Sequence, residues 1–345
     1  MDDAKRQSHL RRSSFLAVFL LLLLAVTFTF ALKAGTFALD WKDLGNSLLE
    51  HLLGGEPTLS RAHEIIIWRI KLPRLLLAIL TGMATAVAGT VYQGCFRNPL
   101  VEPYLLGASS GAALGASLAV VFPDIFLNGA SSAFLFAMSA VMLSFWLARK
   151  KHETPAVTLI LSGLIVGALF TAFVGIMKYL ASDTELREIT FWMMGGFYYA
   201  SWEDVRDVAA LAIPCMILLM PMGWKLNILS LGDEEARSLG VFPDRLRLWL
   251  IVLSTLAVAV CVAHAGIIAW VGLMIPHAAR MLFGPDNRWV LPCSALLGAL
   301  YLLLCDTAAR TLTGAEIPLA IITSIAGAPY LLWLIRTRGK DLYGS

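Results

Sequence analysis

The sequence predicts an all-α polytopic membrane protein with about ten transmembrane helices. Of its 345 residues, 58% are hydrophobic and only 15% are charged, whereas soluble domains are about 45–50% apolar and about 25% charged. Continuous apolar runs, such as 15–32 and 317–335, have the length that a spanning helix requires. A membrane β-barrel is excluded, because its strands would appear as short alternating segments.

The expected spans follow the apolar runs along the chain. They lie near 15–32, 75–93, 104–122, 130–148, 155–180, 205–222, 246–264, 267–283, 289–309 and 317–335. A single helix over 246–283 would be about 57 Å long, against a hydrocarbon core of about 30 Å. This run must therefore turn back, and Gly266, Gly272 and Pro276 are the candidates for the break.

Charge placement predicts the orientation. An even number of spans puts both termini on one side, and both ends of the chain are basic: Lys5, Arg6, Arg11 and Arg12 at one end, and Arg336, Arg338 and Lys340 at the other. The positive-inside rule assigns that side to the cytoplasm. We therefore expect a single transmembrane domain over 1–345, with cytoplasmic tails at 1–14 and 336–345 and a cytoplasmic loop at 223–245. The basic run 149–151 fits this orientation.

One basic cluster opposes that orientation. Arg61, Arg69, Lys71 and Arg74 precede the second span on the expected outer side. Two interpretations stay open at this point. The side chains are interfacial anchors that extend from a helix end to water, or they form an external docking site for an acidic partner.

The loop between the sixth and seventh spans has the signals of a short helix. Asp233 is placed to cap its N-terminus, Glu234 and Glu235 suit the first turn, and Gly240 suits its C-terminal end. A helix lying on the cytoplasmic face would offer a contact for a soluble partner. An ordinary capped loop helix is the alternative.

Motifs for chemistry are absent from the sequence. There is no Walker A motif, no H-E-x-x-H and no G-x-S-x-G, and the six histidines are scattered. The five cysteines lie in or beside apolar runs, so we expect buried thiols and no disulfide framework. We expect no enzyme activity, no nucleic-acid partner, no metal site and no cofactor on this chain. A secondary transporter driven by an ion gradient is the alternative, although charges in mid-span are scarce.

Several motifs in sequence order resemble the FecCD family of ABC importer permeases. The resemblance runs from about residue 65 to the C-terminus and rests on 71–74, 93–103, 106–112, 191–196, 231–241, 266–280, 306–310, 316–318 and 327–329. These include the segments Lys71-Leu72-Pro73-Arg74, Trp192-Met193-Met194-Gly195 and Ile275-Pro276-His277. The family takes up ferric siderophores, haem, cobalamin and related chelates.

The resemblance implies a fold and a set of partners. It implies ten helices per subunit in two groups of inverted topology, a homodimer with the pore at the dimer interface, and two cytoplasmic ATPase subunits that bind ATP and Mg. It also implies a periplasmic or extracellular substrate-binding protein, and the inner membrane of a bacterium or archaeon as the location. The cargo would be a metal chelate, with ferric siderophore expected first and haem, cobalamin or molybdate as further candidates.

The resemblance also implies roles for individual residues. Lys71, Arg74 and Arg310 would dock the binding protein, with Lys71 replacing the usual arginine and losing its bidentate fork. Asp306, four residues before Arg310, is placed to pair with it. The ATPase-coupling residues would be Gly232, Asp233, Glu234, Glu235, Ala236, Arg237, Leu239 and Gly240.

Gating or pore candidates form a third set. Asn98-Pro99 and Pro276-His277 are helix-breaking pairs, for which plain helix termination is the favoured interpretation. His264 lies near the outer end of the seventh span, and a hydrogen bond to the backbone is favoured over contact with the cargo.

Overall fold

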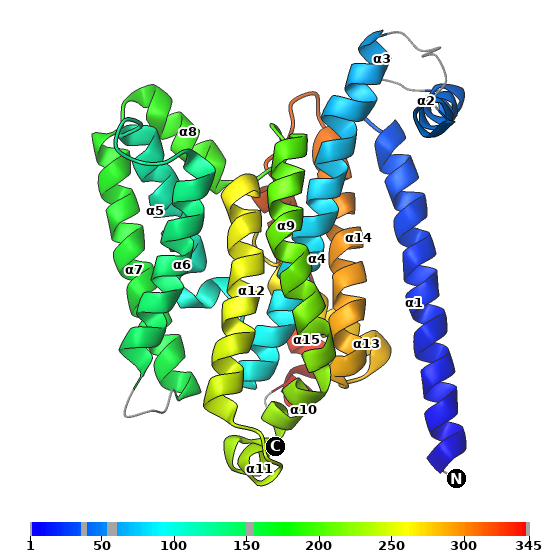
Figure 1. Ribbon diagram of the computed structural model, residues 1–345, viewed down its shortest axis with the longest axis vertical. Helices are drawn as coiled ribbons and strands as arrows, with labels where there is room; N and C mark the ends of the chain where they lie inside the picture. The colour runs from blue at the N-terminus through cyan, green and yellow to red at the C-terminus, as the bar shows by residue number, and fades with distance from the viewer. Residues whose placement is uncertain (1, 36–39, 54–60, 150–154, 343–345) are drawn as a thin grey trace.

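The protein forms a bundle of α-helices in a computed structural model that describes residues 2–35, 40–53, 61–149 and 155–342 (Figure 1). Within these residues there is no strand. The apolar helices that correspond to predicted spans are α1 (Asp2–Lys33), α4 (Leu72–Phe96), α5 (Ala108–Val121), α6 (Gly129–Ala148), α7 (Ala156–Leu180), α9 (Trp202–Leu219), α12 (Pro243–Ala265), α13 (Val271–Phe283), α14 (Asn287–Thr311) and α15 (Leu319–Leu342). Each matches one predicted span, so the all-α polytopic fold is confirmed.

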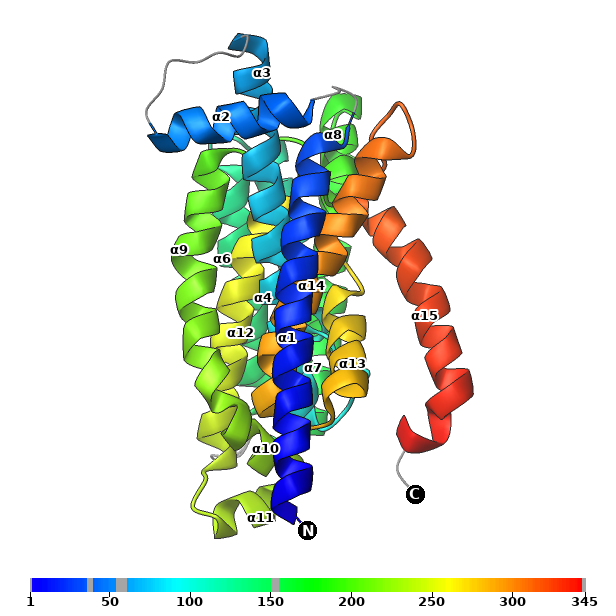
Figure 2. The same cartoon turned by 90° about the vertical axis from the view of Figure 1, so that its right-hand side faces the viewer.

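Shorter elements connect these helices. They are α2 (Trp41–Leu53), α3 (Arg61–Ile65), η1 (Ile66–Lys71), η2 (Pro103–Leu106), α8 (Asp183–Met193), η3 (Met220–Met222), α10 (Gly223–Leu231) and α11 (Asp233–Ser238). The hydropathy pattern did not predict α2 or α8, because neither is long or apolar enough to be found as a span. In Figure 2, α2 crosses the bundle instead of following its axis.

The two ends of the bundle carry different elements. α4 starts beneath α3 and runs toward α11, whereas α12 starts beside α11 and runs the other way (Figure 1). Successive spans alternate in direction, so the second and the seventh span are expected to run in opposite directions, as α4 and α12 do. α1 begins and α15 ends at the same end of the bundle as α11 (Figure 2). We call these the α3 end and the α11 end.

Glycines with positive φ set two of the breaks. α12 ends at Ala265, and Gly266 follows with φ +69°, which confirms the turn predicted between 246 and 283. Gly107, with φ +86°, separates η2 from α5, so the span predicted over 104–122 has a helix of only 14 residues. At 1.5 Å per residue this helix is about 21 Å long and crosses only part of a bilayer.

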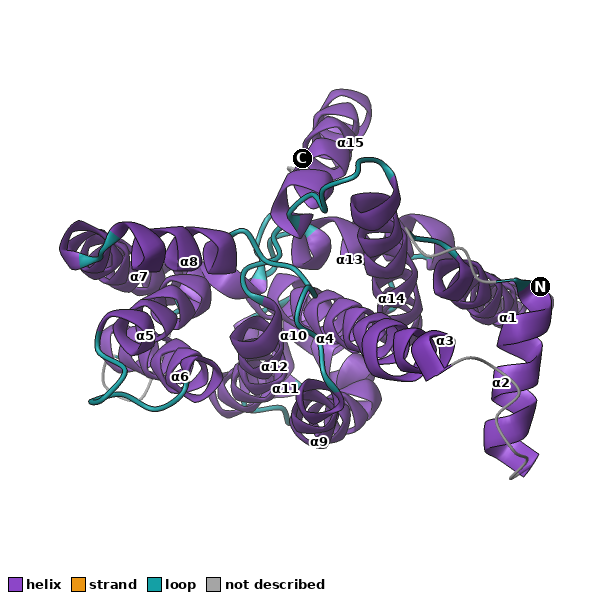
Figure 3. Ribbon diagram, turned by 90° about the horizontal axis from the view of Figure 1, so that it is seen from above, coloured by secondary structure: helices purple, strands orange, loops and turns teal. Residues whose placement is uncertain are grey.

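α4 lies at the centre of the bundle and approaches its neighbours through glycine (Figure 3). A Cβ atom on Gly82 would overlap the carbonyl oxygen of Gly298 in α14, and one on Gly89 would overlap that of Gly272 in α13. Since interhelical attraction in lipid relies on close packing, these contacts fix the position of α4.

We predict that Gly82→Ala lowers the stability of the protein in detergent. The added methyl group must push α4 from α14, and overpacking of this kind costs typically about 1–3 kcal/mol. Gly129→Ala is the matched control, because a Cβ atom there meets nothing within 4 Å. Thermal unfolding of both variants checks this, and equal melting temperatures would contradict the packing argument.

Candidate functional site

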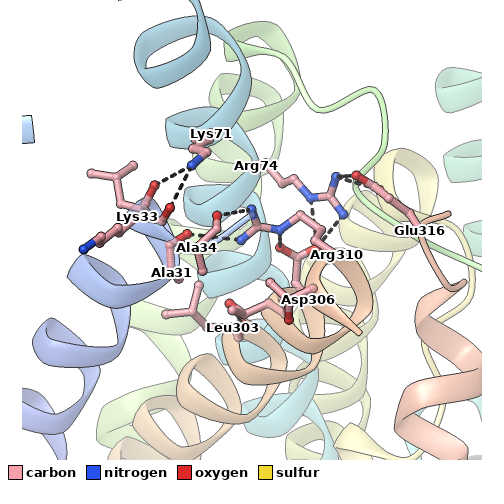
Figure 4. Close-up of polar contacts among 12 residues, drawn as sticks. Ala31, Lys33, Ala34, Lys71, Arg74, Leu303, Asp306, Arg310 and Glu316 are labelled. Carbon is pink, nitrogen blue, oxygen red and sulfur yellow. Dashed lines mark hydrogen bonds and ion pairs between the residues drawn. The ribbon is translucent and has the colours of Figure 1, made fainter. Parts of the chain in front are cut away.

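The three predicted docking cations converge at the α3 end. Lys71 ends η1, Arg74 lies in the first turn of α4, and Arg310 lies in the last turn of α14 (Figure 4). Each residue is less than one-tenth exposed in the isolated chain. The structure therefore brings together residues that are 236 to 239 positions apart in the sequence, but it places most of their surface inside the protein.

A fully buried carboxylate holds two of these cations. Asp306 Oδ1 accepts from Arg74 Nε and Nη2, each at 2.9 Å, and Asp306 Oδ2 accepts from Arg310 Nε at 3.0 Å. The pair between Asp306 and Arg310 at i,i+4 confirms the sequence prediction. A charge with no exposure costs several kcal/mol to bury alone, so the three groups stabilise one another only as a set.

A second carboxylate closes the other edge of Arg74. Glu316 lies in the loop between α14 and α15, and its Oε1 and Oε2 accept from Arg74 Nη1 at 2.9 and 2.8 Å. Unlike Asp306, the Glu316 side chain is 40% exposed. In the sequence, Glu316 stands out only as part of the family motif at 316–318. Its partnership with Arg74 spans 242 residues and has no local signal.

The remaining donors of the cluster bind the C-terminal end of α1. Lys71 Nζ donates to the carbonyls of Leu32 at 2.8 Å and Lys33 at 3.3 Å, and Arg310 donates to those of Ala31 and Ala34, each at 3.3 Å. These carbonyls have no partner within the helix and carry the negative end of its dipole. Lys71 and Arg310 therefore fasten a peripheral helix to α4 and α14. The compact ammonium of Lys71 fits between two carbonyls.

At the α11 end, a buried arginine holds the predicted coupling helix. Arg247 of α12 is 2% exposed; its Nη2 donates to Asp233 Oδ1 at 2.8 Å, and its Nε donates to the Cys95 carbonyl of α4 at 3.2 Å. The prediction that Asp233 caps α11 was wrong. Gly232 holds the N-cap position with φ +140°, because the Asp233 side chain is turned toward Arg247.

The rest of the predicted coupling set surrounds a short, exposed helix. Ala236 is fully buried and anchors α11, whereas Glu234, Glu235, Arg237 and Leu239 are exposed. Gly240 has φ +79°; its N–H donates to the Arg237 carbonyl at 3.0 Å, and the N–H of Val241 donates to the Ala236 carbonyl at 2.9 Å. This pattern is that of a glycine-ended helix, as predicted.

The two helix-breaking pairs behave differently. α4 ends at Phe96, Arg97 adopts a left-handed φ of 50°, and the N–H of Asn98 donates to the Gln93 carbonyl, so termination at Asn98-Pro99 is confirmed. In the loop that follows, burial raises the pKa of Glu102.

Termination at Pro276-His277 was wrong, because both residues lie inside α13. Proline lacks the N–H that would bond to the carbonyl four residues earlier, which is that of Gly272. Gln93 of α4 supplies a side-chain donor in place of the missing N–H. Its Nε2 lies 3.5 Å from the Gly272 carbonyl and donates to the Leu273 carbonyl at 3.0 Å. Gln93 Oε1 accepts from Arg280 in the next turn. A neighbouring helix thus stabilises the continuous α13.

His264 is bonded to a side chain and not to the backbone that sequence reasoning favoured. Its Nδ1 lies 2.7 Å from Asp204 Oδ1, and Asp204 Oδ2 accepts from both the N–H and the hydroxyl of Ser201. His264 thereby joins the C-terminal end of α12 to the N-terminus of α9. It also lines a cavity of about 770 Å³ at the α3 end, with Tyr198 and Arg187 on other walls.

The bundle and its two ends define the class of the protein. A solved structure described as an inward-facing conformation of a metal-chelate type ABC transporter superposes with a TM-score of 0.84 and 37% identity, over 94% of this chain and 99% of the other. The chain is thus a multi-pass ABC transporter permease, a transport subunit.

Sequence comparisons give the family. The model of the FecCD transport family matches residues 22–337. The molybdate import permease MolB of Haemophilus influenzae is 40% identical over 90% of this chain and 92% of its own length. The hemin transport permease HmuU of Yersinia pestis is 39% identical over 94% and 96%, and the cobalamin import permease BtuC of Halobacterium salinarum is 36% identical over 90% and 83%. This chain belongs to the FecCD transport family, as the motifs predicted.

We predict that Asp306→Asn strongly destabilises the protein. The substitution leaves two buried guanidinium groups without their shared carboxylate, and breaking a buried pair costs about 3–5 kcal/mol. Asp207→Asn is the control, because its ion pair with Arg206 is exposed and such pairs contribute about 0–1 kcal/mol. Equal denaturation midpoints for the two variants in detergent would show that Asp306 does not hold the cluster.

Proposed function

We propose that this chain is the membrane-spanning subunit of a binding-protein-dependent importer for a metal chelate. The observation that carries the proposal is the arrangement of the bundle: a cation cluster at one end and a short exposed helix anchored by Arg247 at the other. A binding protein would dock at the cluster, and an ATPase would receive α11. Nucleotide-driven closure would then move the spans in alternating access.

The assembly that this function requires includes further chains. We propose a homodimer with the pore between its subunits, two ATPase subunits that hold ATP and Mg, and a periplasmic or extracellular binding protein. The chain would lie in the inner membrane with both termini cytoplasmic, and the basic chain ends support this orientation. An ion-gradient-driven transporter is not favoured, because the relatives named above are permeases of import systems.

The cargo that we propose is a ferric siderophore, with haem, cobalamin and molybdate as further candidates. Relatives of similar identity are named for molybdate, hemin and cobalamin. A shared permease architecture with differing cargoes suits a system in which the binding protein selects the chelate.

Docking must act through the cluster as the structure arranges it. The carboxylates of Asp306 and Glu316 already bind Arg74. Of the two, Glu316 is the one that lies on a partly exposed loop. We therefore propose that a carboxylate of the binding protein replaces Glu316 on Arg74. Backbone bonds from Leu319 and Ala320 to the carbonyls of Gly195 and Met194 tie the start of α15 to the segment between α8 and α9. Release of Glu316 would loosen that connection.

Uptake in proteoliposomes tests the importer proposal. The ATPase and ATP are enclosed, the binding protein is added outside, and uptake of a radiolabelled ferric siderophore is compared with that of haem, cobalamin and molybdate. Uptake that requires both ATP and binding protein is the expected result. Uptake driven by an ion gradient without the ATPase would refute the proposal in favour of a secondary transporter.

We expect Glu316→Gln to tighten docking of the binding protein, by roughly three- to tenfold. The substitution frees one edge of Arg74, and hydrogen bonds to charged groups contribute about 1.5–3 kcal/mol, less where water has access. The matched variant Arg74→Gln/Glu316→Gln removes the whole pair and should weaken docking, while Asp306 keeps Arg310. Binding to permease in nanodiscs, measured by interferometry, checks both. Unchanged affinity in the double variant would rule out docking at Arg74.

Arg247→Met should uncouple ATP hydrolysis from uptake. The variant removes the links from α12 to Asp233 and to the end of α4, so movement of α11 would no longer reach the spans. Uptake per ATP hydrolysed should fall roughly tenfold, the factor that about 1.4 kcal/mol of lost coupling gives. Lys225→Met, an exposed substitution at the same end, is the control. If Arg247→Met assembles with the ATPase and transports normally, the link has no coupling role.

A further inference from the structure

A basic cavity with an apolar rim lies at the α11 end of the bundle. It has a volume of about 550 Å³ and lies where the C-terminal end of α6 meets α11 and the first turns of α12. Figure 1 shows these helix ends beside one another. The docking cluster has no residue in this cavity, and Arg247 itself does not line it, although Arg237 of the predicted coupling set does. Its lining, as far as the chain is described, includes Arg149, Arg237 and Arg245 and one carboxylate, that of Asp244.

Within the described part of the chain, the positive charges of this cavity outnumber the negative ones. Asp244 is bonded to Arg237 at 3.3 Å and lies 4.0 Å from the buried Arg247, so its charge is already offset. Among the residues that the structure describes, Arg149 and Arg245 form no ion pair. Both are exposed, and the Arg245 guanidinium lies 5.7 Å from the ring centre of Phe242. Two guanidinium groups thus remain for an anion from outside.

The rim of the cavity is apolar and faces outward. Trp146 is 72% exposed, Phe242 is 69% exposed and Leu248 is 40% exposed. These residues adjoin the ends of spanning helices, where aromatic side chains mark the border between hydrocarbon and headgroups. A small soluble anion would need the arginines but not this rim. A phospholipid would use both, with its phosphate on the arginines and its acyl chains along α6 and α12.

We propose that this cavity is a binding site for the headgroup of an anionic phospholipid. Basic pockets between spanning helices recognise such headgroups through charge, and one basic side chain near an anionic membrane surface contributes a factor of about five in affinity. A bound lipid would lie against both α6 and the start of α12. It would thereby hold the base of α11 from the membrane side.

Titration of the delipidated full-length permease tests the site. Phosphatidylglycerol or phosphatidylcholine is added in detergent, and lipid retention is measured by native mass spectrometry. The wild type should prefer phosphatidylglycerol, and Arg149→Gln/Arg245→Gln should weaken its binding about 25-fold, a factor of about five for each charge. Lys225→Gln, an exposed lysine outside the cavity at the same end, should leave binding unchanged. Unchanged melting temperatures would show that the variants are folded.

Three results would overturn the proposal. The double variant could retain phosphatidylglycerol as the wild type does, or inorganic phosphate could displace the lipid, which would indicate a site for a free anion. The third such result is that assembly with the ATPase subunits abolishes the preference for phosphatidylglycerol. The arginines would then belong to the ATPase contact. Retention of the preference in the assembled complex supports the lipid site.

Discussion

The carboxylate of Asp306 is the group on which the α3 end of the protein depends. It has no exposure, and both of its oxygens are bonded to arginines that come from different helices. Because Arg310 continues to the carbonyls at the end of α1, and Arg74 continues to Glu316 in the loop before α15, one buried charge aligns four segments of the chain. Buried ion sets hold only when each member is compensated. The positions of α1 and the α14–α15 loop therefore follow from this one carboxylate.

α4 connects this cluster to the opposite end of the bundle. Arg74 lies in its first turn, and the carbonyl of Cys95, near its last residue, accepts from Arg247, which in turn holds α11. The helix has 25 residues, so it is about 37 Å long. Backbone contacts at glycine on two sides leave it little room to bend. A displacement at either end would therefore pass along one closely packed helix.

Sequence reasoning predicted what depends on local pattern. Hydropathy located the apolar helices, Gly266 located the sharp turn, and spacing predicted the pair between Asp306 and Arg310. It failed where a distant segment decides the structure. Pro276 stays in a helix because Gln93 compensates the Gly272 carbonyl, and Asp233 does not cap α11 because Arg247 binds it. The end of α1 is capped by Lys71, nearly 40 positions away, and by Arg310, nearly 280 positions away. No local pattern could indicate these contacts.

The charge balance of the cluster explains how cations that are largely buried would still attract an acidic partner. Lys71, Arg74 and Arg310 face two carboxylates, so one positive charge remains, and the dipole of α1 offsets it only in part. A site with surplus positive charge favours the approach of a carboxylate. If a partner's carboxylate replaces Glu316, Arg74 stays paired throughout, and the exchange avoids the large cost of leaving a buried guanidinium alone. Asp306 remains in place during that exchange, so docking would require movement of a partly exposed loop and not of the buried centre.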